Sequence, residues 1–430
     1  MSEAAFETSE AVFEPSEAES TMPKPALDGI KVLDLSRVLA GPSCTMTLAD
    51  LGAEVWKIEH PQSGDDTRSW RPPEAGGEST YYLSTNRNKR SVAIDLKSPA
   101  GQDIVRRLAD KADVLTENMR RGTLERLGLG WDVLRQSNPR LIYCAISGYG
   151  RSGPRADDPG YDVLAQAESG LMSITGTPDS GPLKHGVAIV DLVTGLNATQ
   201  AILAALVARQ RTGQGQFIDI ALLDSAVALL ANVGSGYLNA GSTPKRGGNG
   251  HPTVVPYGTF EASDTIFVLG CGNDRQFRAI CRDVIGQPQL ADDPHYRRNQ
   301  DRQQHRDALA ALLTDIFRQK TAAHWIEALK AAGVPAGIVR NLGEVFAAPE
   351  VVERHLVNRA PHPTIGEVAM LASPLRLQGT PPRQPTAPPL LGQHTRAVLG
   401  DVLGFTPQEL DRLVADHVVA DLERGPARQI

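Results

Sequence analysis

Asp191 is a single acidic residue near the start of a long apolar segment, within Gly186–Gly195 (GVAIVDLVTG). Residues 188–211 around it predict a long buried helix. One interpretation is that Asp191 merely compensates the positive end of the helix dipole, an effect of about 0.3–1 kcal/mol. The other is that its carboxylate attacks an activated acyl group while the helix end stabilises the resulting oxyanion. Residue type alone favours the first interpretation.

Two further groups of residues could serve the same chemistry. The pair Tyr161-Asp162 follows a glycine-rich turn at 148–150 and could either cap the next helix or contact a substrate. The segment 246–251 (RGGNGH) carries little side-chain volume, which suits a linker, a close approach to a ligand or a mobile lid. Its glycines are Gly247, Gly248 and Gly250.

Several common enzyme classes are excluded by the absence of their motifs. The first strand, 30–35, leads into 36–42 (SRVLAGP), not into the G-x-G-x-x-G turn of a dinucleotide-binding protein. The P-loop, the H-E-x-x-H helix and the G-x-S-x-G elbow are also missing from the sequence. The ten histidines show no ligand-like spacing, so the sequence predicts no metal site.

Charge and composition narrow the partners and the compartment. The 430 residues include 44 basic and 50 acidic ones, so the basic excess of a nucleic-acid binder is absent. Residues 1–25 are rich in glutamate and are expected to be a disordered acidic tail, neither a signal peptide nor a presequence. No run of 18 apolar residues predicts a membrane span. Four scattered cysteines favour a reducing cytoplasm.

The alternation of predicted elements indicates an α/β protein. Strands predicted at 30–35, 53–58, 91–95 and 141–147 are separated by helical segments, which predicts a parallel sheet with right-handed crossovers. The predicted large domain covers 26–225 and is completed by 350–430. Residues 226–256 are interpreted as a linker with the glycine loop, and 257–349 as a small α+β domain that begins with a hairpin.

At its motifs the chain resembles the class III CoA-transferases, the family of formyl-CoA transferase, carnitine CoA-transferase and α-methylacyl-CoA racemase. The resemblance covers nearly all of 27–430. Within the family, the chain is most similar to the subgroup of succinate–hydroxymethylglutarate CoA-transferase. The resemblance implies a Rossmann-like large domain and an interlocked homodimer. It is carried by 29–41 (GIKVLDLSRVLAG), 53–59 (AEVWKIE), 64–68 (GDDTR), 86–91 (NRNKRS), 112–118 (ADVLTEN), 139–150 (PRLIYCAISGYG) and 389–395 (PLLGQHT).

The resemblance also implies roles for individual residues. Asp191 matches the nucleophilic aspartate of the family, which reverses the preference based on residue type. Gly247, Gly248 and Gly250 match the loop that covers the aspartyl intermediate, and Tyr161 and Asp162 are assigned to positioning the acceptor. Coenzyme A is expected as a substrate, with no permanently bound cofactor. The residues expected to bind it are Val38, His60, Ile94, Lys97, Asn118, Met119, Arg120 and Arg126.

Two departures from the family pattern indicate which activity within the family the chain has. Leu39 replaces a glutamine that reads oxalate in formyl-CoA transferase, and losing this donor argues against oxalate. The racemases carry Gly-His-Asp and an upstream histidine, whereas this chain has Gly160–Asp162 (GYD) and no histidine in 131–135. A transferase is therefore favoured over a racemase or epimerase, and over a non-catalytic CoA-binding protein.

The expected reaction moves CoA from a donor, succinyl-CoA, to a small dicarboxylic acid through an aspartyl-CoA thioester. Glutarate, malate, itaconate, citramalate and hydroxymethylglutarate remain open as acceptors. Each step exchanges one activated acyl group for another, so the reaction needs neither ATP nor a metal. Charge alone suggests that Arg68, Arg71 or Arg87 binds the distal carboxylate of the acid.

Overall fold

The computed structural model describes residues 23–422 and divides into two compact units. The first contains the described parts of Met1–Ala145, Ala198–Ile218 and Asn358–Ile430, and the second contains Ile146–Asn197 and Asp219–Val357. The predicted domains, by contrast, placed all of 26–225 together. The predicted acidic tail, 1–25, lies almost entirely outside the described residues.

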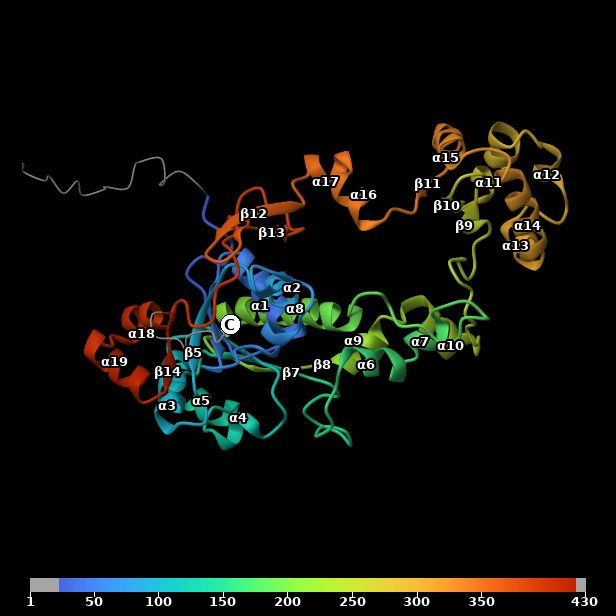
Figure 1. Ribbon diagram of the computed structural model, residues 1–430. Coiled ribbons are helices and arrows are strands. Elements are labelled where there is room, and N and C mark those ends of the chain that lie inside the picture. Colours follow the sequence, from blue (N-terminus) through green and yellow to red (C-terminus); the bar gives the residue numbers. More distant parts are fainter. Residues whose placement is uncertain (1–22, 423–430) are drawn as a thin grey trace, which may run out of the picture. The chain divides into compact units, whose positions relative to one another are not determined.

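The first unit is built on a seven-stranded sheet with the order β14-β5-β2-β1-β6-β7-β8. Strands β5, β7, β8 and β14 of this sheet are labelled in Figure 1. Strand β1 pairs in parallel with β2 and β6, β2 pairs in parallel with β5, and β6 with β7. The predicted α/β class with a parallel-rich sheet is thereby confirmed. The short β14 is antiparallel to β5 at the edge. The bounds are Lys31–Asp34 (β1), Glu54–Glu59 (β2), Lys89–Ile94 (β5), Val114–Glu117 (β6), Ile142–Ser147 (β7), Phe217–Ala221 (β8) and Val419–Ala420 (β14).

Helices between the strands begin where the sequence predicts them. Helix α1 (Ala40–Asp50) connects β1 to β2, and α3 (Pro99–Ala109) follows β5. The hydroxyl of Ser98 caps α3 by accepting a hydrogen bond from the Gly101 N–H at 2.9 Å, and Pro99 occupies the first turn, where its missing N–H costs nothing.

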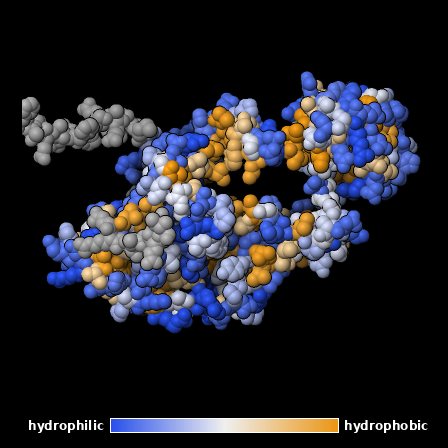
Figure 2. All heavy atoms as spheres, viewed as in Figure 1, coloured by the Kyte–Doolittle hydropathy of each residue, from blue (hydrophilic) through white to orange (hydrophobic). Residues whose placement is uncertain are grey.

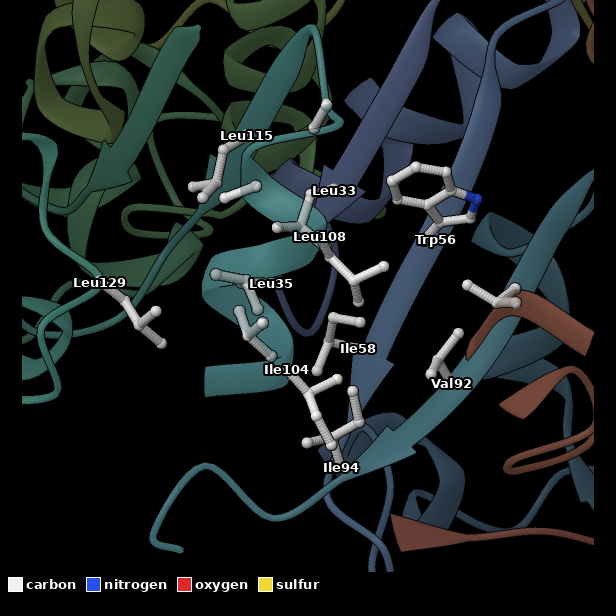
Figure 3. Close-up of a cluster of buried hydrophobic side chains, with 14 of the residues drawn as sticks. Leu33, Leu35, Trp56, Ile58, Val92, Ile94, Ile104, Leu108, Leu115 and Leu129 are labelled. Carbon is white, nitrogen blue, oxygen red and sulfur yellow. The ribbon is translucent and has the colours of Figure 1, made fainter. Parts of the chain in front are cut away.

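The core of the first unit lies between this sheet and α3. Figure 3 shows Leu33, Ile58 and Ile94, from three adjacent strands, directed toward Ile104 and Leu108 of the helix. All five side chains are buried. Burying each of them contributes about 1.5–3 kcal/mol to folding. The sheet and its carboxyl-end loops are therefore anchored by this core.

The second unit contains two short helices where the sequence predicts one helix over 161–172. These are α6 (Asp162–Glu168) and α7 (Leu171–Ile174). Gly170 between them has φ +92°, a left-handed conformation that ends α6. Both pack with the start of α8 (Ile189–Thr212) and with α9 (Leu222–Ala228) around Ala165, Val190, Leu222 and Ala226.

The rest of the second unit contains a three-stranded sheet and several helices. Strands β9 (Tyr257–Glu261) and β10 (Ile266–Gly270) form the predicted antiparallel hairpin, and β11 (Ala336–Ile338) adds to β10. Helices pack around Phe267, Phe277 and Phe317. They include α11 (Asp274–Ala279), α14 (Arg306–Phe317) and α15 (Ala322–Ala331). The unit also contains α13 (Asn299–Gln304), α16 (Leu342–Ala347) and α17 (Pro349–Glu353).

A hairpin and two helices follow these elements along the chain. Strands β12 (Val357–His362) and β13 (Gly366–Leu371) form a hairpin sheet. The Pro-rich stretch 381–389 then precedes two C-terminal helices, as the sequence predicts. These are α18 (Thr395–Leu403) and α19 (Pro407–Ala415).

Helix α8 is long and apolar enough to cross a membrane by length and composition alone. Its burial follows one face, because Val190, Thr194, Ala198, Ile202 and Ala205 recur at helical spacing and are almost completely buried. A helix with one buried stripe is the pattern of a core helix that packs against protein.

Candidate functional site: a cavity at the sheet edge and a pair of carboxylates

A cavity of about 290 Å³ lies at the carboxyl ends of the parallel strands in the first unit. Strands β1, β2 and β5 lie to one side of the point where the strand order reverses, and β6 lies to the other. Ligands of open α/β sheets bind in the crevice at such a point. Four of the predicted CoA residues line this cavity: His60 after β2, Ile94 and Lys97 at the end of β5, and Met119 after β6.

Three other predicted CoA residues lie at or near this edge without lining the cavity. Asn118 joins two of the loops, because its amide accepts from the Arg37 N–H at 2.8 Å and donates to the Arg37 carbonyl at 2.7 Å. Arg37 itself lines the cavity. Arg120 and Arg126 are exposed just beyond β6, and Arg126 donates to the Thr123 hydroxyl at 3.4 Å.

The loop after β1 is held in a strained conformation. Val38 has φ +72°, which is rare for a β-branched residue. Its N–H donates to the Asp65 carboxylate at 3.2 and 3.3 Å, and the Lys57 ammonium donates to the Ser36 carbonyl at 3.0 Å. Strain of this kind persists only where surrounding contacts fix it. Leu39 is buried and precedes α1 as its N-cap residue.

The same loop rests on buried ion pairs. Lys57 is fully buried and pairs with Asp65 at 2.8 Å, while Lys89 pairs with Asp34 at 3.2 Å. Burial by itself raises the pKa of Asp65, but the Lys57 ammonium and the hydrogen bonds from Lys57 and Thr67 outweigh it and lower that pKa to about 2. Asp34 is likewise held below its usual pKa by Lys89 and Lys57, against its burial. These carboxylates are therefore anionic and fixed.

In the second unit, Asp191 lies in the first turn of α8, as the sequence predicts. Asp162, the first residue of α6, reaches this helix start and accepts hydrogen bonds from the Val190 N–H at 2.8 Å and the Asp191 N–H at 3.2 Å. The carboxylate of Asp162 thus caps α8 from a different helix, in the manner of an N-cap side chain.

Asp162 is itself held by Gln166, one turn further along α6. The Gln166 amide donates to the second Asp162 oxygen at 2.5 Å, and its carbonyl oxygen accepts from the His185 N–H at 2.8 Å. Gln166 is 2% exposed, so it has little access to water as an alternative partner. Both oxygens of Asp162 therefore carry protein donors, which favours a positioning role over direct contact with an acceptor acid.

Asp191 has the opposite surroundings. In the described part of the chain, no hydrogen bond reaches its carboxylate oxygens and no Lys or Arg pairs with it. Burial, together with the like charge of Asp162, raises the pKa of Asp191 to about 7. A nucleophilic or acid–base group commonly shows such a perturbed pKa.

Two glycines allow Asp162 to reach α8. The backbones of Gly148 and Gly160 touch, so that a Cβ built on Gly160 would lie 2.3 Å from the Gly148 Cα. No residue other than glycine fits at this contact. The contact joins the end of β7 to the segment that begins α6. Tyr161 follows it directly, with its side chain 62% exposed.

The glycine loop is anchored at both ends within the second unit. The Gly248 N–H donates to the Gly176 carbonyl at 2.9 Å, and the Arg246 guanidinium donates to the Thr177 carbonyl at 3.2 Å. At the other end, Arg306 of α14 donates to the His251 carbonyl at 2.9 Å. Gly247, Gly248 and Gly250 are exposed, and Gly248 has φ +60°.

The candidate arginines for a distal carboxylate divide into two kinds. Arg87 is buried and donates to both oxygens of Asp50, at 2.9 and 2.5 Å. Arg68 pairs with Glu59 at 2.8 Å and lies over the Tyr82 ring. Such buried pairs leave little capacity for a substrate. Arg71 is exposed and pairs loosely with Glu74 at 3.3 Å.

Sequence reasoning missed Gln166, the Lys57–Asp65 pair and the Gly148–Gly160 contact. Gln166 stands one helical turn after Asp162, a spacing at which an amide can reach a carboxylate, and this signal was available. The other two depend on contacts between segments distant in sequence and leave no local pattern.

Comparison with known proteins identifies the family. The family model described as CoA-transferase family III matches residues 27–395. Succinyl-CoA:glutarate CoA-transferase of Mus musculus is 44% identical over 92% of this chain and 91% of its own. Acetyl-CoA:oxalate CoA-transferase of Acetobacter aceti is 41% identical over 86% and 94%.

A solved structure supports the same assignment. The CAIB/BAIF family protein from Brucella suis has a TM-score of 0.79 and 40% identity, and the match covers 88% of this chain and 100% of that one. Sequence and fold therefore agree, and the chain belongs to CoA-transferase family III.

Proposed function

We propose that this protein transfers CoA from succinyl-CoA to a small dicarboxylic acid, with Asp191 as the nucleophile. The observation that carries the proposal is the carboxylate of Asp191 at the start of α8, in a member of a family of CoA-transferases. Among residues 23–422 no cation pairs with this carboxylate and no donor reaches it. A carboxylate without ion-pair partners is available to attack an acyl group.

The reaction exchanges acyl groups at Asp191 in balanced steps. One carboxylate oxygen attacks the thioester carbonyl, the C–S bond breaks, and CoA thiolate leaves a mixed anhydride on the enzyme. The thiolate then attacks the Asp191 carbonyl carbon and releases the donor as a carboxylate. The acceptor carboxylate reverses both steps with its own acyl group. Coenzyme A is a substrate throughout, and no ATP or metal enters.

The cavity at the sheet edge suits the nucleotide end of CoA. Arg37, His60 and Lys97 supply cationic or hydrogen-bonding groups there, and Ile94 and Met119 supply apolar contacts. Arg120 and Arg126 lie next to this edge and can pair with phosphates. We assign the same role of CoA binding to Val38 and Asn118 through the loop that they shape.

The acceptor is proposed to be glutarate or a similar dicarboxylic acid, because the mouse relative acts on glutarate. Leu39 offers no side-chain donor to oxalate, whereas the relative from Acetobacter aceti is named for oxalate. A comparison of candidate acceptor acids decides between glutarate and oxalate. Glutarate, oxalate, malate, itaconate and citramalate are each offered with succinyl-CoA, and new CoA esters are measured by mass spectrometry. Oxalyl-CoA as the main product would overturn the assignment.

The nucleophile is tested with two variants, one that keeps the shape of the side chain and one that removes the carboxyl group. Asp191→Asn and Asp191→Ala are both expected to lose transfer by at least about 10³-fold, since each removes the covalent route. Hydroxylamine added to the wild-type enzyme with succinyl-CoA should convert the thioester to a hydroxamate that maps to residue 191. Normal turnover in either variant would sink the mechanism.

A racemase or epimerase is distinguished by isotope exchange. That activity would incorporate deuterium from D₂O at the α-carbon of an acyl-CoA without any acceptor acid. A transferase shows no such exchange. A non-catalytic CoA-binding protein would bind CoA and show neither reaction.

The glycine loop is proposed to exclude water from the thioester, since hydrolysis would end each cycle. Gly247, Gly248 and Gly250 can bring backbone N–H groups close to the intermediate. Tyr161 is proposed to position the acceptor, because its exposed ring directly precedes Asp162.

We further propose a homodimer in a reducing compartment, the cytoplasm. Apolar side chains gather on α16 and α17 (Figure 2), where Leu342, Phe346 and Val352 are exposed by 44% or more. A second copy would bury this surface. All four cysteines are free and buried, as expected of a reduced protein. Light scattering on a size-exclusion column that gives one chain per particle would refute the dimer.

A further inference from the structure

The carboxylates of Asp162 and Asp191 differ in what they touch, although they meet at the same helix end. Asp162 receives three hydrogen bonds, two from backbone N–H groups and one from Gln166. Asp191 receives none in the described part of the chain. Burial and the like charge of Asp162 raise the pKa of Asp191, so Asp191 is the carboxylate of the pair that resists ionisation.

Other charges near this helix end do not reverse the asymmetry. Glu168 of α6 is engaged by Arg155 at 2.6 Å, and Asp224 of α9 is exposed. In the segment before α8, the Lys184 ammonium donates to the His185 carbonyl, and the His185 ring accepts from the Val187 N–H. Helix α7 contributes no titratable group. Asp162 is the one charge that acts on Asp191 among these described residues.

The proposed reaction changes the charge of Asp191. When the thioester forms, the free carboxylate of Asp191 becomes neutral and the negative charge leaves with the released donor acid. Repulsion from Asp162 is therefore present before this step and relieved after it. A fixed like charge at this position favours the covalent enzyme over the free one.

We propose that Asp162 and Gln166 are positioning residues that work as a unit: Gln166 holds the Asp162 carboxylate against the start of α8, and the Asp162 charge drives Asp191 toward its CoA thioester. This inference rests on the proposed function and adds the reason why Asp191, and not its neighbour, is acylated. Asp162 touches neither the acyl group nor CoA in this account; it acts through Asp191 and through the backbone at the start of α8.

The test measures how much enzyme carries CoA at equilibrium. Wild-type protein is mixed with succinyl-CoA and a fixed excess of succinate, without acceptor, and intact mass spectrometry gives the fraction with CoA attached. Asp162→Asn retains an oxygen that can accept the two N–H bonds but loses the charge. At pH 8 the equilibrium constant for thioester formation should fall on the order of 3- to 10-fold in this variant. This factor corresponds to a decrease of about half to one unit in the pKa of Asp191, since one unit corresponds to tenfold.

A second readout is the pH profile of kcat/KM, which reports the groups of the free enzyme. Its acidic limb should lie near pH 7 in the wild type and move to lower pH in Asp162→Asn. A purely structural effect would lower the rate without moving the limb. The matched control is Glu168→Gln, which removes the same charge from the same helix and should change neither the limb nor the fraction with CoA attached.

Gln166→Met keeps the proposal testable if Asp162→Asn does not fold. Without this donor the Asp162 carboxylate can turn away from the start of α8, so both readouts should move in the same direction as for Asp162→Asn, by a smaller factor. Unchanged limbs and unchanged CoA attachment in the folded variants would overturn the inference. Absence of any CoA attachment in the wild type would instead overturn the proposed function itself.

Discussion

Two regions of this protein hold buried or partly buried carboxylates, and the surroundings of these carboxylates differ in the opposite sense. Beneath the loop after β1, Asp34 and Asp65 each have a lysine within 3.2 Å, and their pKa values are held low. At the start of α8, Asp191 has no cation partner in the described chain, and its pKa is raised to about 7. The first arrangement fixes structure, and the second keeps a carboxylate reactive.

The difference follows from what each charge must do during the reaction. A carboxylate that holds a loop must not change its charge, so cations and hydrogen bonds stabilise the anion. A carboxylate that becomes an ester gains from surroundings that destabilise the anion. Cation partners at Asp191 would stabilise the free enzyme and oppose acylation.

The largest expected effect tests the structural region. Asp65→Asn leaves the Lys57 ammonium buried without its counter-ion and should lower the free energy of unfolding by about 3–5 kcal/mol. Urea unfolding at pH 7 measures it. The double variant with Lys57→Met should recover part of the loss, because no uncompensated charge remains. A loss below about 1 kcal/mol in the single variant would show that the pair does not hold the loop.

A smaller effect on stability is expected at Asp191, where removing the charge should stabilise the folded protein. Its pKa of about 7 in the folded protein exceeds the ordinary value of 3.8, so ionisation opposes folding as the pH rises from about 4 through 7. Asp191→Asn should therefore be more stable than the wild type at pH 8, by roughly 2 kcal/mol after allowance for screening, and no more stable near pH 4. Thermal and urea unfolding at both pH values measure this. Equal stability at pH 8 would contradict the raised pKa.

The smallest expected effect on stability is at an exposed ion pair, which serves as a reference for the two buried regions. Arg318 and Glu261 lie 2.5 Å apart, with both side chains more than half exposed. Glu261→Gln should leave the free energy of unfolding nearly unchanged, because water and salt screen an exposed pair. A change as large as that of Asp65→Asn would mean that burial is not what separates the two regions.

The sequence was informative about elements whose signals are local. The strand at 30–35, the Ser98-Pro99 helix start, the long helix at 188–211 and the hairpin at 257–270 all match the structure to within a few residues. Period and capping residues were sufficient there. The helix predicted over 161–172 is interrupted at Gly170, because its left-handed backbone conformation cannot continue an α-helix.

The site was less predictable, for a physical reason. Asp191 was found through its match to a family motif, and its residue type alone favoured a structural role. Lys57 lies in strand β2, and a lysine in a strand is usually expected to be exposed. It is fully buried because its ammonium group pairs with the buried Asp65 carboxylate. The bonds from Asp162 to residues 190 and 191 span 28 and 29 positions, beyond any local pattern.

The touching backbones of Gly148 and Gly160 have a consequence for any attempt to re-engineer this enzyme. Adding one methyl group at either position changes no charge and no hydrogen-bonding group, but it forces the two strands of chain apart at a contact that admits nothing larger than hydrogen. Asp162 stands two residues beyond Gly160 and would move with it. An apolar substitution at Gly148 or Gly160 would therefore change the distance between Asp162 and Asp191, and with it the electrostatic environment of the nucleophile. The spacing of these two backbone segments thus sets the reactivity of Asp191.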